Sequence, residues 1–153
     1  MTQKNIYLAK FKGDFWPKPE ELKPYFKNWF NHYGNDSAGI SLLGVNNTSH
    51  LPFAGGRQDI NLLLWGQPNL GVLLIYELNG KAPVRTWCSK GDMTRLKEYV
   101  RSTHDDPLPV GLFIPFADAF KAVKEFMETE GKLPKSIDWV RDEDLPPDIF
   151  PDP

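Results

Sequence analysis

Residues 111–140, GLFIPFADAFKAVKEFMETEGKLPKSIDWV, carry the most regular pattern in the chain. The apolar run GLFIPF that opens the stretch is typical of a short buried strand. Apolar residues then recur three and four positions apart, which predicts an amphipathic helix over 116–129 with its apolar face packed on a sheet. Gly131 is expected to end this helix in a left-handed cap, and 136–140 is expected to form another short strand. The succession fits either a βαβ-like unit or the edge of an α+β fold.

The chain before this stretch is rich in strand signals. Strands are predicted at 4–11, 38–45, 57–65, 71–78 and 83–89. The links between the last three are short enough for hairpins, so these strands should form an antiparallel meander. Asn79-Gly80 is the strongest hairpin signal, because both positions tolerate the positive φ of a type I′ turn.

An N-terminal helix is predicted within residues 17–33. Pro24 lacks an amide hydrogen and clashes one turn back, so the helix begins either near Pro17 or at Pro24 itself. The residues expected on its buried face are Phe26, Trp29, Phe30 and Tyr33.

Two shorter segments follow the meander. Residues 91–102 are predicted to form a short helix capped by Asp92, and residues 102–110 a polar loop. The fold class expected from these elements is α+β: a mainly antiparallel sheet, with an N-terminal helix and a C-terminal amphipathic helix packed on it.

Length and composition favour one ordinary globular domain over residues 1–153, with 41% hydrophobic and 25% charged residues. The lone cysteine, Cys88, excludes an intramolecular disulfide and favours a reducing compartment. The N-terminus lacks the apolar run of a signal peptide, and no apolar run is long enough to cross a bilayer. These observations predict a cytoplasmic protein without membrane association.

The C-terminal segment 141–153 differs from the rest of the chain because it is acidic and rich in proline. Its acidic residues are Asp142, Glu143, Asp144, Asp148 and Asp152, against the single base Arg141. The segment is expected to be either a solvated end or an electrostatic arm for a basic partner.

The sequence shows no recognisable catalytic pattern. The three histidines lie outside metal-ligand spacing of one another and of Cys88, which also lacks a neighbouring base in the sequence. No nucleophile elbow, phosphate-binding loop or dinucleotide fingerprint is present, and no basic cluster suggests nucleic-acid binding. We therefore expect no catalytic residue, metal or cofactor. A binding protein is favoured, and the alternatives are a small enzyme with a site assembled from distant residues or a generic protein-interaction domain.

The C-terminal stretch resembles the first-numbered immunity-protein family of bacterial polymorphic toxin systems. The matching positions are Ile114-Pro115, Glu125-Phe126, Gly131, Pro134, Ile137 and Trp139. Upstream, WCSKGD at 87–92 is similar to the family's strand that ends in Ser and Gly-Asp, and DPLPVGLFIP is similar to the loop before its final strand. The resemblance covers residues 57–140 best. The matching prolines, glycine and aromatic residues are expected to specify a scaffold.

The resemblance implies a non-enzymatic protein that binds and neutralises the C-terminal domain of a cognate toxin, in a one-to-one complex that blocks the toxin's active site. Partners in this family are often nucleic-acid deaminases. A toxin that acts on nucleic acid should have a positively charged cleft, so acidic residues are the candidate contacts. They are Asp105, Asp106, Asp142, Glu143, Asp144 and Asp148. Tyr and Trp side chains outside the core are the expected anchors.

Overall fold

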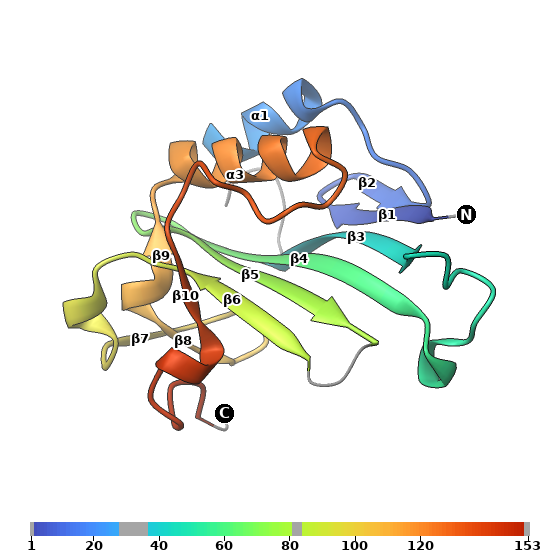
Figure 1. Ribbon diagram of the computed structural model, residues 1–153. Coiled ribbons are helices and arrows are strands. Elements are labelled where there is room, and N and C mark those ends of the chain that lie inside the picture. The colour runs from blue at the N-terminus through green and yellow to red at the C-terminus, as the bar shows by residue number, and fades with distance from the viewer. Residues whose placement is uncertain (1, 28–36, 81–83, 152–153) are drawn as a thin grey trace.

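The computed structural model describes residues 2–27, 37–80 and 84–151. The fold is α+β: two helices cover one face of a sheet whose paired strands are all antiparallel (Figure 1). The strand order is β10-β6-β5-β4-β3-β1-β2, and β9 also pairs with β5. These strands are β1 (Gln3–Leu8), β2 (Phe11–Gly13), β3 (Ser37–Val45), β4 (Gln58–Gln67), β5 (Gly71–Asn79), β6 (Arg85–Ser89), β9 (Phe113–Ile114) and β10 (Trp139–Arg141). The helices are α1 (Pro19–Lys27) and α3 (Phe116–Glu128).

The predicted meander is confirmed by the pairing of β4 with β5 and of β5 with β6. The prediction of a type I′ turn at Asn79-Gly80 is wrong. Leu78 pairs with Arg85, and Asn79 is the last residue of β5, paired with Asp59. The connection is therefore longer than two residues, because pairing with β4 keeps Asn79 extended and only Gly80 of this dipeptide has a positive φ.

Helix α3 is confirmed where the sequence predicts it. Pro115 is its N-cap, with an extended ψ of 148°, so it directs the chain into the helix rather than providing the first helical residue. At the other end Glu130 adopts the left-handed conformation, and the Gly131 N–H donates to the Phe126 carbonyl at 2.8 Å. This is a Schellman ending, in which Gly131, also at positive φ, is the residue after the left-handed position. The strand that follows runs antiparallel to β6, so the α+β alternative is confirmed over the βαβ unit.

Helix α1 begins at Pro19 and continues through Pro24, so the alternative start at Pro24 is wrong. The reason lies at its N-terminus, where the Glu21 carboxylate accepts the Lys18 N–H at 2.7 Å. This contact stabilises a start before Pro24. Phe26 is buried as predicted. Trp29, Phe30 and Tyr33 lie outside the described residues.

The prediction of a helix over residues 91–102 is wrong. Only one 3-10 turn, Met93–Arg95, is present, and Asp92 caps it by accepting the Thr94 N–H. The chain then forms β7 (Tyr99–Arg101), which pairs with β8 (Pro107–Pro109) in a separate ribbon. The predicted polar loop therefore contains a buried strand, because Leu108 points into a hydrophobic core and pairing with β7 holds the two prolines extended.

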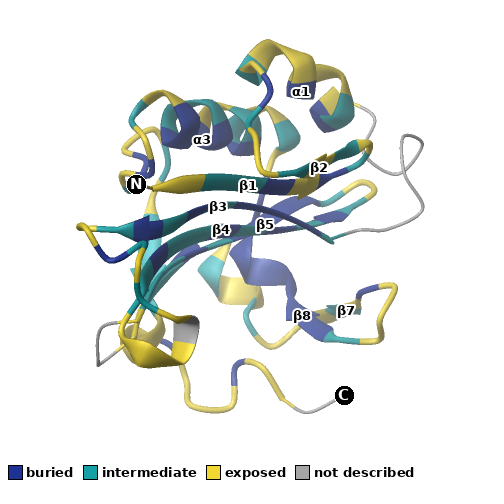
Figure 2. Ribbon diagram, turned by 90° about the vertical axis from the view of Figure 1, so that its right-hand side faces the viewer, coloured by how far each residue is buried: buried dark blue, intermediate teal, exposed yellow. Residues whose placement is uncertain are grey.

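Two hydrophobic cores lie on opposite faces of the sheet. Figure 2 shows the buried residues in dark blue on the strands and on the elements that cover them. The larger core lies between the sheet and the helices, and at its centre the fully buried Phe126 ring packs on Trp16 and Tyr76. We call the smaller one the second core; its buried members are Leu73, Cys88, Leu108, Leu112, Phe113, Leu145 and Ile149. None of the described helices is long and apolar enough to cross a membrane.

The second core corrects the expectation of a free C-terminal end. Leu145 and Ile149 are only 7% and 9% exposed, and they hold the segment after β10 against the sheet. The Tyr99 hydroxyl also donates to the Ile149 carbonyl at 3.2 Å. The acidic segment is therefore packed at two points, with its charged side chains outside.

Replacing Phe126 with Ala should lower the free energy of unfolding by about 3–5 kcal/mol, because the ring is fully buried and its removal leaves a cavity. Phe120→Ala is the matched control on the same helix, where the ring is only partly buried against Phe26. Urea denaturation of both variants measures the difference. An equal or larger loss for Phe120→Ala would contradict the assigned packing of α3.

Candidate partner-binding surface

The turn over residues 102–106 joins β7 to β8 and is organised by a buried serine. The Ser102 hydroxyl oxygen accepts the backbone N–H groups of His104 and Asp106, at 3.2 and 3.1 Å. The same hydroxyl donates to the Asp106 carboxylate at 3.3 Å. Asp105 adopts a left-handed conformation, with a φ of 66°. Because of these contacts the Asp105 and Asp106 carboxylates have different partners, although the two residues are adjacent in the sequence.

Asp105 is exposed and lies 3.7 Å from the Arg101 guanidinium. Surface ion pairs of this kind contribute about 0–1 kcal/mol. Asp106 is half-buried and lies at the edge of a pocket. The two acids predicted as one contact therefore have different environments.

The predicted acids of the C-terminal segment are exposed. Asp142, Glu143 and Asp144 form one 3-10 turn directly after β10. The Arg141 guanidinium lies 4.0 Å from the first carboxylate and 3.8 Å from the second. Asp148 lines a different hollow of about 550 Å³, together with Lys97 and Tyr99.

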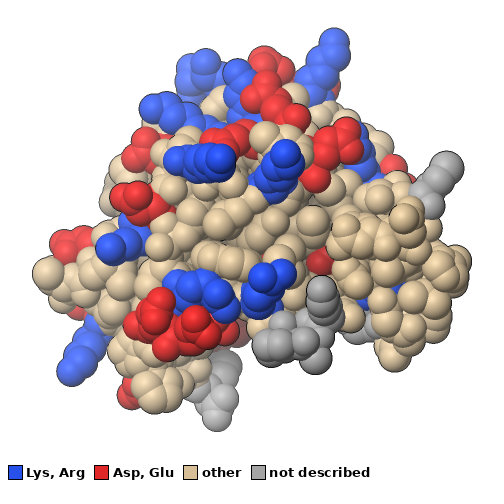
Figure 3. All heavy atoms as spheres, viewed as in Figure 1, with Lys and Arg blue, Asp and Glu red and all other residues tan. Residues whose placement is uncertain are grey.

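Charged groups are mixed on the face seen in Figure 3. Acidic and basic side chains alternate over the helices, and acidic atoms lower on this face lie directly beside basic ones. The structure places the predicted acids in two separate segments, the 102–106 turn and residues 142–148. Of these acids, Asp106 lines the pocket that the turn shares with Phe150 and Pro151 at the end of the C-terminal segment.

The sheet face opposite the helices is only partly covered by the second core. Strand pairing aligns Tyr7, Gly39, Leu63 and Ile75 in one row across β1, β3, β4 and β5. Tyr7 is 45% exposed, whereas Leu63 and Ile75 are half-buried and Ile75 packs against the second core. The row therefore leaves an aromatic side chain exposed at its Tyr7 end, the residue type that protein partners use as an anchor.

The Tyr7 ring lies over Gly39, so a larger residue at this position would displace the ring. A Cβ atom at Gly39 would lie 2.4 Å from the Tyr7 ring. Burial and the charge of Glu77 raise the pKa of the Tyr7 phenol, so it stays a neutral hydrogen-bond donor at physiological pH.

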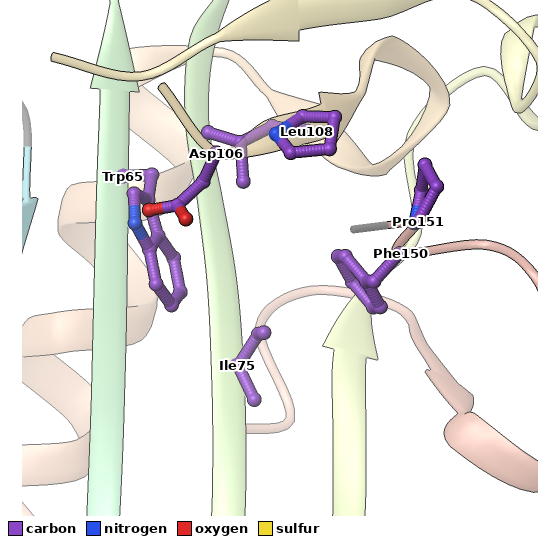
Figure 4. A pocket seen from close by; sticks show the side chains of 7 residues that line it. Trp65, Ile75, Asp106, Leu108, Phe150 and Pro151 are labelled. Carbon is purple, nitrogen blue, oxygen red and sulfur yellow. The ribbon is translucent and has the colours of Figure 1, made fainter. Parts of the chain in front are cut away.

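A pocket of about 280 Å³ lies where the sheet face meets the β7–β8 ribbon and the C-terminal segment (Figure 4). Trp65 and Ile75 come from the sheet, Asp106 and Leu108 from the ribbon, and Phe150 and Pro151 from the C-terminal segment. In this view Trp65 and Phe150 lie on opposite sides, and the Asp106 carboxylate is turned toward the Trp65 side. The pocket therefore combines two aromatic side chains with one carboxylate.

Sequence reasoning missed the residues that build this pocket with Asp106. Trp65 lies in the predicted strand 57–65, and the alternation of β4 places its side chain on the face away from the helices. Phe150 was overlooked because its segment is acidic and rich in proline. The usable signal was the pair Ile149-Phe150, since two adjacent apolar residues are unusual in a purely solvated end.

The described residues offer little catalytic chemistry. No group of three or more His, Cys, Asp or Glu among them could hold a metal ion. The Cys88 thiol is buried, and desolvation with a smaller effect of the Asp142 charge raises its pKa to about 12. A thiol in this environment is not a nucleophile at neutral pH.

Comparison with known proteins gives one match. A family model described as immunity protein Imm1 matches residues 28–141. The match includes β3 to β10 with α3, and it begins before the region in which the sequence resemblance was strongest. No curated protein and no solved structure matches the chain.

Cys88 should resist alkylation by iodoacetamide at pH 8 in the folded protein and react once the protein is unfolded in urea. The pKa is raised from its ordinary value of 9.0 to about 12, so the folded state keeps a proton that the unfolded state loses between these values. The protonated Cys88 thiol therefore contributes to the free energy of unfolding below about pH 9, and this contribution is lost as the pH rises toward the folded-state pKa of about 12. Rapid labelling under native conditions would contradict the buried environment.

Leu145→Ala should lower the free energy of unfolding by about 2–5 kcal/mol, because this side chain is part of the second core. Asp144→Ala is the control one position earlier, at an exposed site, and should change stability by less than about 0.5 kcal/mol. Chemical denaturation of both variants measures the effect. Equal stabilities would mean that the C-terminal segment does not pack on the sheet.

Proposed function

The chain belongs to the immunity protein Imm1 family, and from this premise we propose that it binds the C-terminal domain of a cognate toxin and covers the toxin's active site. The family assignment carries the proposal, since it implies toxin neutralisation and a toxin partner. The proposed partner is a nucleic-acid deaminase or another toxin that acts on nucleic acid, and the proposed setting is the cytosol. The complex contains one copy of each protein.

Inhibition by occupancy, without catalysis, is supported by the chemistry of the described residues. The buried Cys88 thiol is not activated, and the acids predicted as contacts face solvent or a pocket. Immunity proteins in general are not enzymes. A protein that acts by occupancy must instead present a surface that matches its partner in shape and charge.

The acids named from the sequence remain the proposed partners of a basic cleft. Exposed acids act mainly on the association rate, because they steer a positive partner before contact and are screened by salt. On this basis Asp142, Glu143, Asp144 and Asp148 are rim residues. Asp105 belongs with them, since it is exposed and already has a cationic neighbour.

The decisive measurement is a titration of the toxin domain encoded by the neighbouring gene. Its activity on nucleic acid should fall linearly with added protein and disappear at a ratio of one to one. Native mass spectrometry of the mixture should show one copy of each chain. Loss of toxin activity at far lower ratios would indicate an enzyme, and full activity in the presence of excess protein would overturn the proposal.

A further inference from the structure

The pocket between the sheet, the ribbon and the C-terminal segment has the chemistry of a site for a cationic side chain. Its walls are apolar, and its charged group is the Asp106 carboxylate. The Trp65 indole offers an aromatic face, which attracts cations more strongly than the other aromatic rings do. Lys and Arg combine an apolar stem with a charged end, so they match a pocket with apolar walls and one acid.

Asp106 differs from Asp105 and Asp59 because no base among the described residues pairs with it. Asp105 lies beside Arg101, and Asp59 forms a bidentate pair with Arg57. Among the described residues, no Lys, Arg or His lies within ion-pair distance of the Asp106 carboxylate. Among the described residues, the neutral Ser102 hydroxyl donates a hydrogen bond to this carboxylate, which fixes its position without neutralising its charge.

The other hollow near the C-terminal segment has a different balance of charge. It contains an acid, Asp148, and also a cation, Lys97, which would repel an additional cation. The first pocket is distinguished by a carboxylate without a cation in its lining.

We propose that the pocket lined by Trp65, Asp106 and Phe150 receives one arginine side chain of the toxin domain, an inference that rests on the proposed function. The guanidinium pairs with the Asp106 carboxylate and stacks on the Trp65 indole, and its aliphatic stem contacts Phe150. Arginine fits better than lysine because its planar group can stack and donate two parallel hydrogen bonds to a carboxylate. Such a contact, at the junction of three structural segments, has the composition of a binding hot spot.

The site also explains how the protein recognises a toxin that binds nucleic acid. Arginines that contact phosphate in the toxin's cleft are obvious targets for an inhibitor. An arginine held by Asp106 cannot contact phosphate at the same time. The pocket thus provides an anchor, whereas the exposed acids provide steering.

The test uses Asp106→Asn, which keeps the shape of the side chain and removes its charge, with Asp105→Asn as the matched control in the same turn. Binding to a catalytically inactive form of the neighbouring toxin domain is measured by biolayer interferometry. Asp106→Asn should weaken binding by at least about tenfold, mainly through faster dissociation. Asp105→Asn should change the dissociation rate by less than about twofold, because its carboxylate is exposed. Equal effects of the two variants on the dissociation rate would overturn the site, whereas an effect of Asp105→Asn on the association rate alone would not.

Trp65→Leu provides a second variant that retains apolar bulk and removes the aromatic face. Melting temperatures of all variants establish that each one is folded before its binding is interpreted. Trp65→Leu should also weaken binding by at least about tenfold. Wild-type affinity in both pocket variants would overturn this inference and leave the proposed function intact. Absence of binding by the wild-type protein would overturn the proposed function itself.

The arginine is identified by replacing each toxin arginine with Ala in turn. One replacement should weaken binding to the wild-type protein by at least about tenfold and have little further effect on Asp106→Asn, since the two groups then share one interaction. Coupling to a lysine instead of an arginine would contradict the proposed preference. Independent effects at every arginine and lysine would show that the pocket takes no cationic side chain.

Discussion

The hydroxyl group of Ser89 links β5 to the segment before β9, at the point where one edge of β5 changes its neighbour from β6 to β9. It accepts the Leu74 N–H at 2.9 Å and donates to the Leu112 carbonyl at 2.6 Å. On one side of this point β5 pairs with β6, and on the other side it pairs with β9. Ser89, Leu74 and Leu112 are all buried. Without the hydroxyl, the Leu74 N–H and the Leu112 carbonyl would lose this partner, at a cost of about 1–3 kcal/mol each. The start of α3 and the ribbon that carries Asp106 are both placed relative to this junction.

The residues around Ser89 show why the segment 87–92 is recognisable in sequence. The Lys90 N–H donates to the Asp138 carbonyl, which fixes the approach to β10. Gly91 donates to the Gly111 carbonyl, and a Cβ atom there would lie 2.2 Å from the Phe113 carbonyl oxygen. Only glycine therefore fits between β6 and β9. These requirements are backbone requirements, so the segment identifies a scaffold and carries no information about the partner.

The parts of the fold that the sequence predicts are those whose signal is local and periodic. Helix α3 and the β4–β5–β6 meander follow from the spacing of apolar residues, because each buries one continuous face. The β7–β8 ribbon could not be predicted this way, since Pro107 and Pro109 disfavour a strand and the burial of Leu108 depends on residues far away in the chain. The same holds for the C-terminal segment, which is held by two apolar contacts with residues far away in the chain. The candidate site was predicted in part: Asp106 was chosen for its charge, but its difference from Asp105 depends on the turn around Ser102.

The two faces of the sheet therefore have separable tasks. The helix face is closed by a continuous apolar core, and its residues determine whether the chain folds. The opposite face is closed only in part, and the second core positions the ribbon and the C-terminal segment around the open remainder. Side chains on the exposed edge of this arrangement, such as Asp106 and Phe150, can change with little effect on either core because most of their surroundings are solvent or pocket. On the proposed function, this separation would let the protein follow changes in its toxin, since the proposed recognition residues are attached to the rigid framework without being part of it.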